Sequence, residues 1–215
     1  MTVGYSRPRL ALEFALIFVG LPLLAGWQGQ LLRRWVIPQL LLLAGIFLVL
    51  LWRDPSFDRQ QMRAIPRDWR RSLLRIVASF VLGGAAVLYL AWRSGVDLFS
   101  FPRERPFLWL LVLLLYPLLS ALPQEVIFRA FLFHRYRRLF TDPRVMMLVS
   151  ASAFALAHLQ LGNLLAPGLT FLGGLLFAYT FGTTRSMPMA TLEHGLWGDW
   201  LFTVGLGVYF YGGHS

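Results

Sequence analysis

The chain has 215 residues, of which 57% are hydrophobic and only 14% are charged, and its mean hydropathy is +0.61. This composition excludes an ordinary soluble domain and a disordered chain, and it indicates an integral membrane protein. All twenty basic residues are arginines, against ten acidic residues, and cysteine is absent, which excludes disulfides, thiol catalysis and thiolate metal sites.

Long apolar runs predict the helices of this protein. A membrane-spanning helix needs about 20 mainly apolar residues. By this measure we expect an all-α, polytopic transmembrane helical bundle of about seven spans, near residues 10–27, 36–52, 73–92, 107–130, 145–160, 164–183 and 188–210. No segment between these runs is long and apolar enough to bury a core of its own. Residues 1–215 are therefore predicted to form a single membrane domain.

The arginines lie mainly in the short loops between the runs. Thirteen fall on one side, in the N-terminus, residues 53–72, residues 135–144 and the loop with Arg185, and five fall on the other side. The positive-inside rule then places the N-terminus in the cytoplasm. We expect the arginines to contact the lipid bilayer rather than nucleic acid. The predicted location is a bacterial cytoplasmic (inner) membrane.

Four ionisable side chains stand out within apolar runs. Glu125 and Arg129 lie one helical turn apart in the fourth run and can pair on one helix face. His158 lies in the fifth run and His194 in the seventh. At 1.5 Å per residue from the nearest loop arginine, Glu125, His158 and His194 lie at depths of about 15, 21 and 14 Å. They can meet near mid-membrane if their helices are neighbours, and ionisable groups at that depth indicate function.

A carboxylate and two imidazoles in a dry cavity are suited to activating water. The alternative is a buried ion pair with two histidines that serve as interhelical hydrogen-bond partners. Arg129 stays protonated and is expected to hold Glu125 or a neighbouring helix terminus in place. Asp199, a buried acid five residues after His194, is a further candidate. The chain has no H-E-x-x-H motif, so we predict no metal site, and we expect no other cofactor.

Three motifs carry a family resemblance. QEVIFR spans Gln124 to Arg129, FALAH spans Phe154 to His158, and HGLWGD spans His194 to Asp199. Together they resemble the motifs of the CAAX protease and bacteriocin-processing family of intramembrane glutamic proteases, also called the Abi family. Those motifs are E-E-x-x-x-R, F-x-x-x-H, and a later His followed by Asn or Asp. The resemblance covers about residues 107–205, which we expect to form a protease-like core.

The resemblance implies a membrane endopeptidase that cleaves a membrane-associated protein or peptide. Glu125 would be the base that activates water, His158 would orient the water, and His194 with Asp199 would stabilise the oxyanion. Two positions depart from the family pattern. Gln124 replaces the first Glu, which is thought to activate water, and Gly198 occupies the usual position of the Asn.

Two alternatives stay open. One is a catalytically impaired family member that acts as a membrane binding or maturation partner, as Gln124 suggests. The other is a proton- or ion-coupled transporter, because buried Glu, Asp and His side chains also form relays. No pair of matching broken helices marks the inverted repeat that many transporters have.

Overall fold

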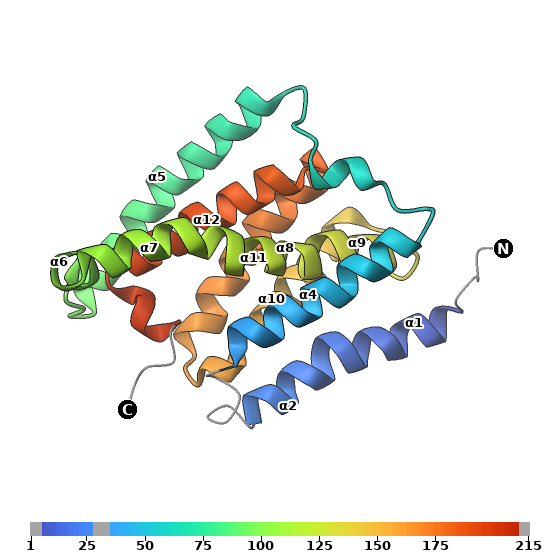
Figure 1. The fold of residues 1–215 in the computed structure, drawn as a ribbon, viewed down its shortest axis with the longest axis horizontal. Coiled ribbons are helices and arrows are strands. Elements are labelled where there is room, and N and C mark those ends of the chain that lie inside the picture. The colour runs from blue at the N-terminus through green and yellow to red at the C-terminus, as the bar shows by residue number, and fades with distance from the viewer. Residues whose placement is uncertain (1–5, 28–34, 211–215) are drawn as a thin grey trace.

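A computed structural model describes residues 6–27 and 35–210, and within these ranges the chain forms helices and no strand (Figure 1). The first half contains α1 (Arg7–Phe14), a π-helical segment (Ala15–Gly20), α2 (Leu21–Trp27), α4 (Val36–Arg53), a 3-10 turn (Arg59–Met62) and α5 (Trp69–Arg93). The short α6 (Ser100–Glu104) leads into the central helix.

The central helix, Pro106–Arg135, carries the first motif. It comprises α7 (Pro106–Tyr116), a π segment (Pro117–Ala121), α8 (Leu122–Glu125), a second π segment (Val126–Phe131) and α9 (Leu132–Arg135). The remaining elements are α10 (Pro143–Ala157), a 3-10 turn (Leu159–Leu161), α11 (Leu165–Thr184), α12 (Met187–Thr203) and a 3-10 turn (Leu206–Tyr209).

Within the described residues, six helices are long and apolar enough to cross a membrane: Arg7–Trp27, Val36–Arg53, Trp69–Arg93, Pro106–Arg135, Pro143–Leu161 and Leu165–Thr184. They confirm the predicted all-α membrane bundle and match the first six expected spans. The seventh expected span corresponds to α12. This helix ends at Thr203 rather than at residue 210, because Gly205 adopts a left-handed backbone conformation with φ of 98°.

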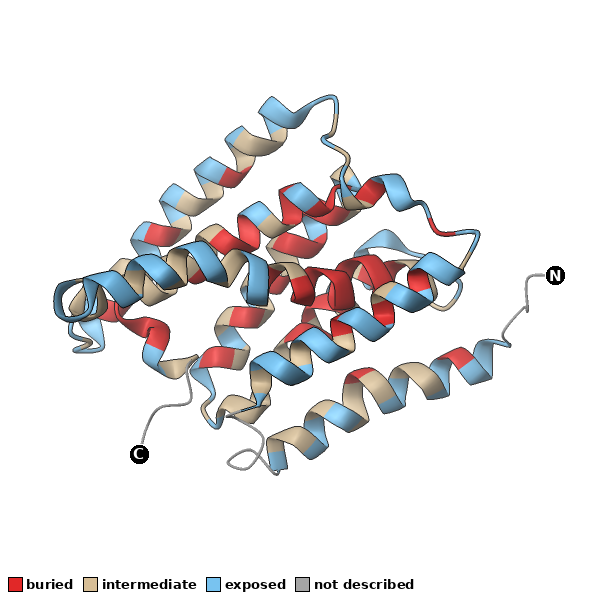
Figure 2. Cartoon of the chain, in the orientation of Figure 1, coloured by how far each residue is buried: buried red, intermediate tan, exposed pale blue. Residues whose placement is uncertain are grey.

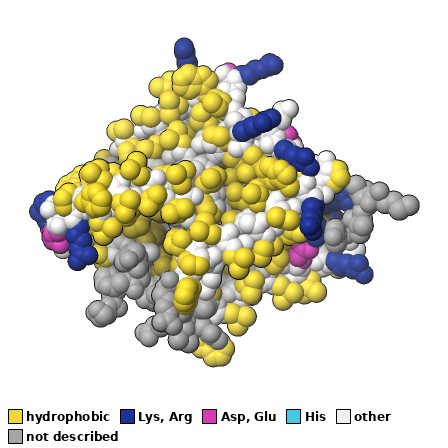
Figure 3. Space-filling view, in the orientation of Figure 1, with side chains coloured by type: hydrophobic (Ala, Val, Ile, Leu, Met, Phe, Trp, Pro, Cys, Tyr) yellow, Lys and Arg dark blue, Asp and Glu magenta, His cyan; other side chains and the backbone are white. Residues whose placement is uncertain are grey.

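The outer surface is that of a protein surrounded by lipid. Large apolar side chains are exposed along the long helices, including Leu82 at 75% and Phe107 at 81%. Buried residues gather around α8, α9 and α12 (Figure 2). Hydrophobic side chains cover the middle of the visible face, and arginines gather at its left end and upper right edge (Figure 3). An apolar surface this extensive is stable only in contact with lipid or a partner.

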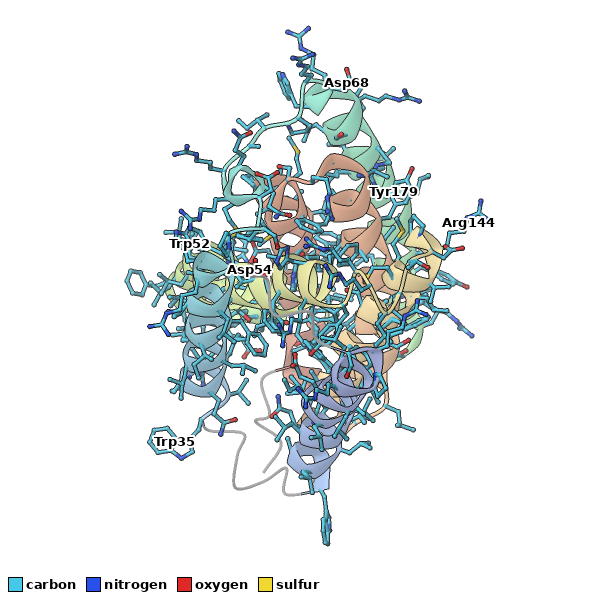
Figure 4. All side chains as sticks on the ribbon, turned by 90° about the vertical axis from the view of Figure 1, so that its right-hand side faces the viewer. Trp35, Trp52, Asp54, Asp68, Arg144 and Tyr179 are labelled. Atoms are coloured by element: carbon cyan, nitrogen blue, oxygen red, sulfur yellow. The ribbon has the colours of Figure 1, made fainter. Side chains whose placement is uncertain are left out.

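Tryptophans mark the ends of the outer helices. Trp35 precedes α4 and Trp52 is its penultimate residue, and Figure 4 shows them at opposite ends of that helix. Trp69 begins α5 and Trp92 lies next to its end. All four side chains are exposed. Amphipathic indole rings favour both membrane interfaces, so this placement agrees with α4 and α5 as spans.

The helices that carry the motifs lie in the middle of the bundle. In Figure 1, the helix formed by α1 and α2 and the helix α5 lie at opposite edges, with α8, α10, α11 and α12 between them. α10 packs along α11, and α12 contacts α5, α7, α8 and α11. Gly174 permits the close approach of α10 and α11, because a Cβ atom there would lie 3.1 Å from the Cα of Ala151.

The central helix is fixed at its C-terminal end by polar contacts. Arg135 donates hydrogen bonds to both carboxylate oxygens of Glu13, at 2.8 and 2.6 Å, and the Tyr136 hydroxyl donates to Glu13 at 3.0 Å. His134 lies 2.9 Å from the Asp54 carboxylate beyond α4. Glu13 thus finds its partners at the C-terminal end of the central helix, and contacts from α1 and from the residue after α4 hold the helix that carries Glu125.

Gln124 and Glu125 lie in the single α-helical turn between the two π segments of the central helix. Pro123 within that turn has no backbone N–H to donate. Wider π turns are common at functional sites, where they change the direction of the side chains that follow. The first of these segments ends three residues before Gln124.

Candidate active site

A cavity of about 1810 Å³ lies between the helices, and most of the side chains that line it are apolar. Four polar lining side chains come from the regions of the three motifs and from α7: Tyr116, Gln124, His158 and His194. Because His158 and His194 both line this cavity, the structure brings together two of the three ionisable groups that the sequence predicts to meet.

The third group, Glu125, contacts His194 directly. Its Oε1 lies 2.9 Å from His194 Nδ1, and both side chains are buried. A carboxylate can only accept a hydrogen bond, so Nδ1 carries the proton, and in the neutral imidazole Nε2 then has the lone pair. That nitrogen lies 3.2 Å from the Tyr116 hydroxyl, which donates to it. The contact between Glu125 and His194 shows that α8 and α12 are neighbours.

Arg129 forms the expected pair with Glu125 and is fully buried. Its Nε lies 3.3 Å from Glu125 Oε2, and its Nη2 donates to the backbone carbonyl of Gly174 at 3.1 Å. The guanidinium also lies over the Phe154 ring, 4.8 Å from its centroid. Arg129 does not line the cavity. Through its contacts with Phe154 and Gly174, Arg129 links the central helix to α10 and α11.

His158 is the C-cap of α10, and its Nδ1 donates to the Phe154 carbonyl at 2.7 Å. A carbonyl only accepts, so this contact leaves His158 Nε2 as an acceptor. The Phe154 ring lies 4.6 Å from the His158 ring and 5.4 Å from the His194 ring. Phe154, which lies one helical turn before His158, therefore packs against both imidazoles.

Gln124 and Glu125 face different surroundings. Gln124 lines the cavity, its Nε2 donates to the Ser120 hydroxyl at 2.7 Å, and its buried Oε1 has no hydrogen-bond partner among the described residues. Glu125 is absent from the cavity wall, and its oxygens lie against Arg129 and His194. The Glu125 carboxylate therefore contacts a residue of the cavity wall, His194, but does not itself line the cavity.

Asp199 does not join this group. It lines a second cavity of about 400 Å³ with Thr191 and Gly195, away from the wall that holds the two histidines. Five residues of α-helix turn a side chain by about 140° relative to the first residue. That rotation explains why Asp199 does not contact His194, with which it was expected to stabilise the oxyanion.

Two residues near His194 were not predicted. Phe177 of α11 stacks on the His194 ring with centroids 4.5 Å apart, and Tyr116 contacts its Nε2. An aromatic residue in an apolar run gives no signal that separates it from ordinary core packing. Within residues 6–27 and 35–210, no three His, Asp or Glu side chains cluster as metal ligands would.

Comparison with known proteins adds one positive finding. Residues 106–198 match a family model described as type II CAAX prenyl endopeptidase Rce1-like. No curated protein and no solved structure matches the chain. The matched segment runs from the start of α7 to Gly198 and so contains Gln124, His158 and His194. This match agrees with the family resemblance of the three motifs, because residues 106–198 are similar to Rce1-like type II CAAX prenyl endopeptidases.

Proposed function

We propose that this protein is a membrane-embedded endopeptidase that hydrolyses a peptide bond of a membrane-associated protein or peptide. The observation that carries the proposal is the buried contact between Glu125 and His194 at the wall of an apolar cavity. A carboxylate that holds an imidazole in one tautomer makes the other ring nitrogen a base. The match to a family of membrane endopeptidases supports the same reaction class.

The geometry favours one change to the roles expected from the sequence. Glu125 was expected to take the proton from water, but it does not line the cavity. We therefore assign the proton transfer to His194 Nε2, with Glu125 orienting the ring and stabilising the imidazolium. His158, whose Nε2 is also an acceptor, would orient the water, as would the unpartnered Oε1 of Gln124.

The reaction then follows in two steps. Water attacks the carbonyl carbon, a C–O bond forms, and the water proton passes to His194 Nε2. The tetrahedral intermediate collapses as the C–N bond breaks, and the imidazolium returns its proton to the leaving amine. Arg129 touches none of the reacting atoms in this scheme. It holds Glu125 in place.

Cleavage of two fluorogenic peptides by the detergent-purified full chain tests the proposal. One peptide carries a farnesylated cysteine in a CAAX-type tail, and the other is an unprenylated membrane-anchored peptide. His194→Ala and His158→Ala should each lower kcat by about 10²- to 10⁴-fold. The effects should add weakly, because both groups act on one transition state. His134→Ala is the matched control, since His134 contacts Asp54 outside the cavity. Full activity in the His194 variant would refute the proposed role.

A second function is favoured by Gln124. The position that faces the cavity holds an amide, and an amide cannot accept a proton as a base does. The protein would then bind membrane-associated partners in the same cavity without cleaving them.

Gln124→Glu separates the two functions. If the native chain cleaves neither peptide and the variant cleaves one, the native protein is an impaired protease and the binding function is supported. If the native chain cleaves and His194→Ala does not, the protease function is supported.

A further inference from the structure

Tyr116 lies where it can take part in the reaction that we propose above. It is the last residue of α7, directly before the first π segment of the central helix. Its side chain lines the cavity, and its hydroxyl lies 3.2 Å from His194 Nε2. The phenol donor therefore stands beside the nitrogen assigned as the base.

Gly198 makes room for this phenol. A Cβ atom at position 198 would overlap the Tyr116 ring and its hydroxyl oxygen. Residue 198 follows His194 by four residues, so it lies on nearly the same face of α12, about 40° away. Tyr116, from another helix, thus fills the space beside Gly198, one turn after His194.

The side chains of Gln124 and Arg129 already have polar partners, and Asp199 faces elsewhere. Gln124 Nε2 donates to Ser120, and Arg129 pairs with Glu125 outside the cavity wall. Asp199 lines the second cavity. The Tyr116 hydroxyl, by contrast, donates only to His194 Nε2 among the contacts of the described residues, and it must release that nitrogen when the base accepts a proton.

We propose that Tyr116 donates a hydrogen bond to the oxyanion of the tetrahedral intermediate, a role that rests on the proposed endopeptidase function. When His194 Nε2 takes the proton from water, it can no longer accept from the phenol. At the same moment the carbonyl oxygen of the substrate becomes negatively charged. The hydroxyl turns from the nitrogen to that oxygen, and no proton leaves Tyr116. Donors that are aimed at developing charge in a water-poor site lower the barrier strongly.

Tyr116→Phe removes the hydroxyl and keeps the ring in the space beside Gly198. With whichever peptide the native chain cleaves, kcat should fall by about 10²- to 10³-fold, while KM changes little. The fall should extend over both limbs of the pH profile, because the lost donor acts on the oxyanion and not only on His194. Tyr89→Phe is the matched control, since Tyr89 is 58% exposed on α5 and lies outside the cavity.

Gly198→Ala provides an independent test that keeps the hydroxyl. The added methyl group displaces Tyr116 and should lower kcat to a similar extent. In a Tyr116→Ala background the space is empty, so the added Gly198→Ala change should cost nothing further. Additive losses in the double variant would show that Gly198 acts independently of Tyr116.

Three outcomes would overturn the inference. Native kcat in Tyr116→Phe means that the hydroxyl is not used. A fall confined to one limb of the pH profile means that Tyr116 only tunes His194. If neither the native chain nor Gln124→Glu cleaves either peptide, the proposed function fails and this inference fails with it. If only Gln124→Glu cleaves, the same variants are measured in that background.

Discussion

Breaking the pair between Glu125 and Arg129 should destabilise the bundle as well as stop the reaction. Glu125→Gln leaves Arg129 charged and fully buried without a carboxylate. Removing one partner of a buried ion pair costs about 3–5 kcal/mol. The Gly174 carbonyl and the Phe154 ring still contact the guanidinium, so we expect the lower end, about 3 kcal/mol. For a domain of this size that corresponds to a fall in Tm of about 6–12 °C.

The double variant Glu125→Gln with Arg129→Met separates stability from chemistry. It removes the Arg129 charge that the single variant leaves unpaired. Most of the decrease in Tm should therefore be reversed, while cleavage stays absent. Thermal unfolding followed by tryptophan fluorescence, in detergent, measures the first effect, and peptide cleavage measures the second. Glu104→Gln, at an exposed position, is the matched carboxylate-to-amide control.

Two results would refute this reasoning. If Glu125→Gln melts within about 2 °C of the native protein, the guanidinium does not depend on the carboxylate. If the double variant melts no higher than the single variant, the loss does not come from an unpaired charge.

Three further predictions concern topology, metal and pH. A reporter fused after residue 60 should lie in the cytoplasm and one after residue 100 on the opposite side, because thirteen arginines face five across the predicted spans; reporters on the same side would show that the span between these positions is wrong. Purified protein should hold less than stoichiometric zinc and keep its activity in chelator, since no two histidines share a pre-organised helix face, whereas one tightly bound zinc lost together with activity would make it a metalloprotease. Hydrogen bonds from His134 and then from Ser56 hold the pKa of Asp54 below its usual range, so its contribution to stability is present above the unfolded pKa of about 3.9 and is lost as the pH falls below it. The Tm of Asp54→Asn should therefore fall less than the native Tm between about pH 5 and pH 3, and equal falls would contradict this.

The sequence predicted most of the helices because a membrane span leaves a direct trace, a run of about 20 apolar residues. The end of α12 was missed, since the apolar pattern continues past Thr203 while the backbone turns at Gly205. Arg33 and Arg34, which enter the topology count, lie outside the described residues. Their side of the membrane stays a prediction.

The sequence predicted which residues form the site better than it predicted which side chains face the cavity. The spacing of Glu125 and Arg129 and the similar depths of Glu125 and His194 follow from helix geometry alone, and both contacts form. Which of Gln124 and Glu125 faces the cavity depends on the rotation of the central helix about its axis, and the π segments in that helix leave no pattern in the residues. Tyr116 reaches His194 from a helix 78 residues earlier in the chain, so only the packing of α7 on α12 reveals it.

The interlocking of Tyr116 with Gly198 limits the order in which these two positions can change during evolution. Any side chain at position 198 occupies the space of the phenol, so a tyrosine with this orientation can be accepted only after glycine is already present. The reverse change must begin at position 116. A variant library that samples each position alone would therefore miss every functional combination that requires both, and the two positions need to be varied together.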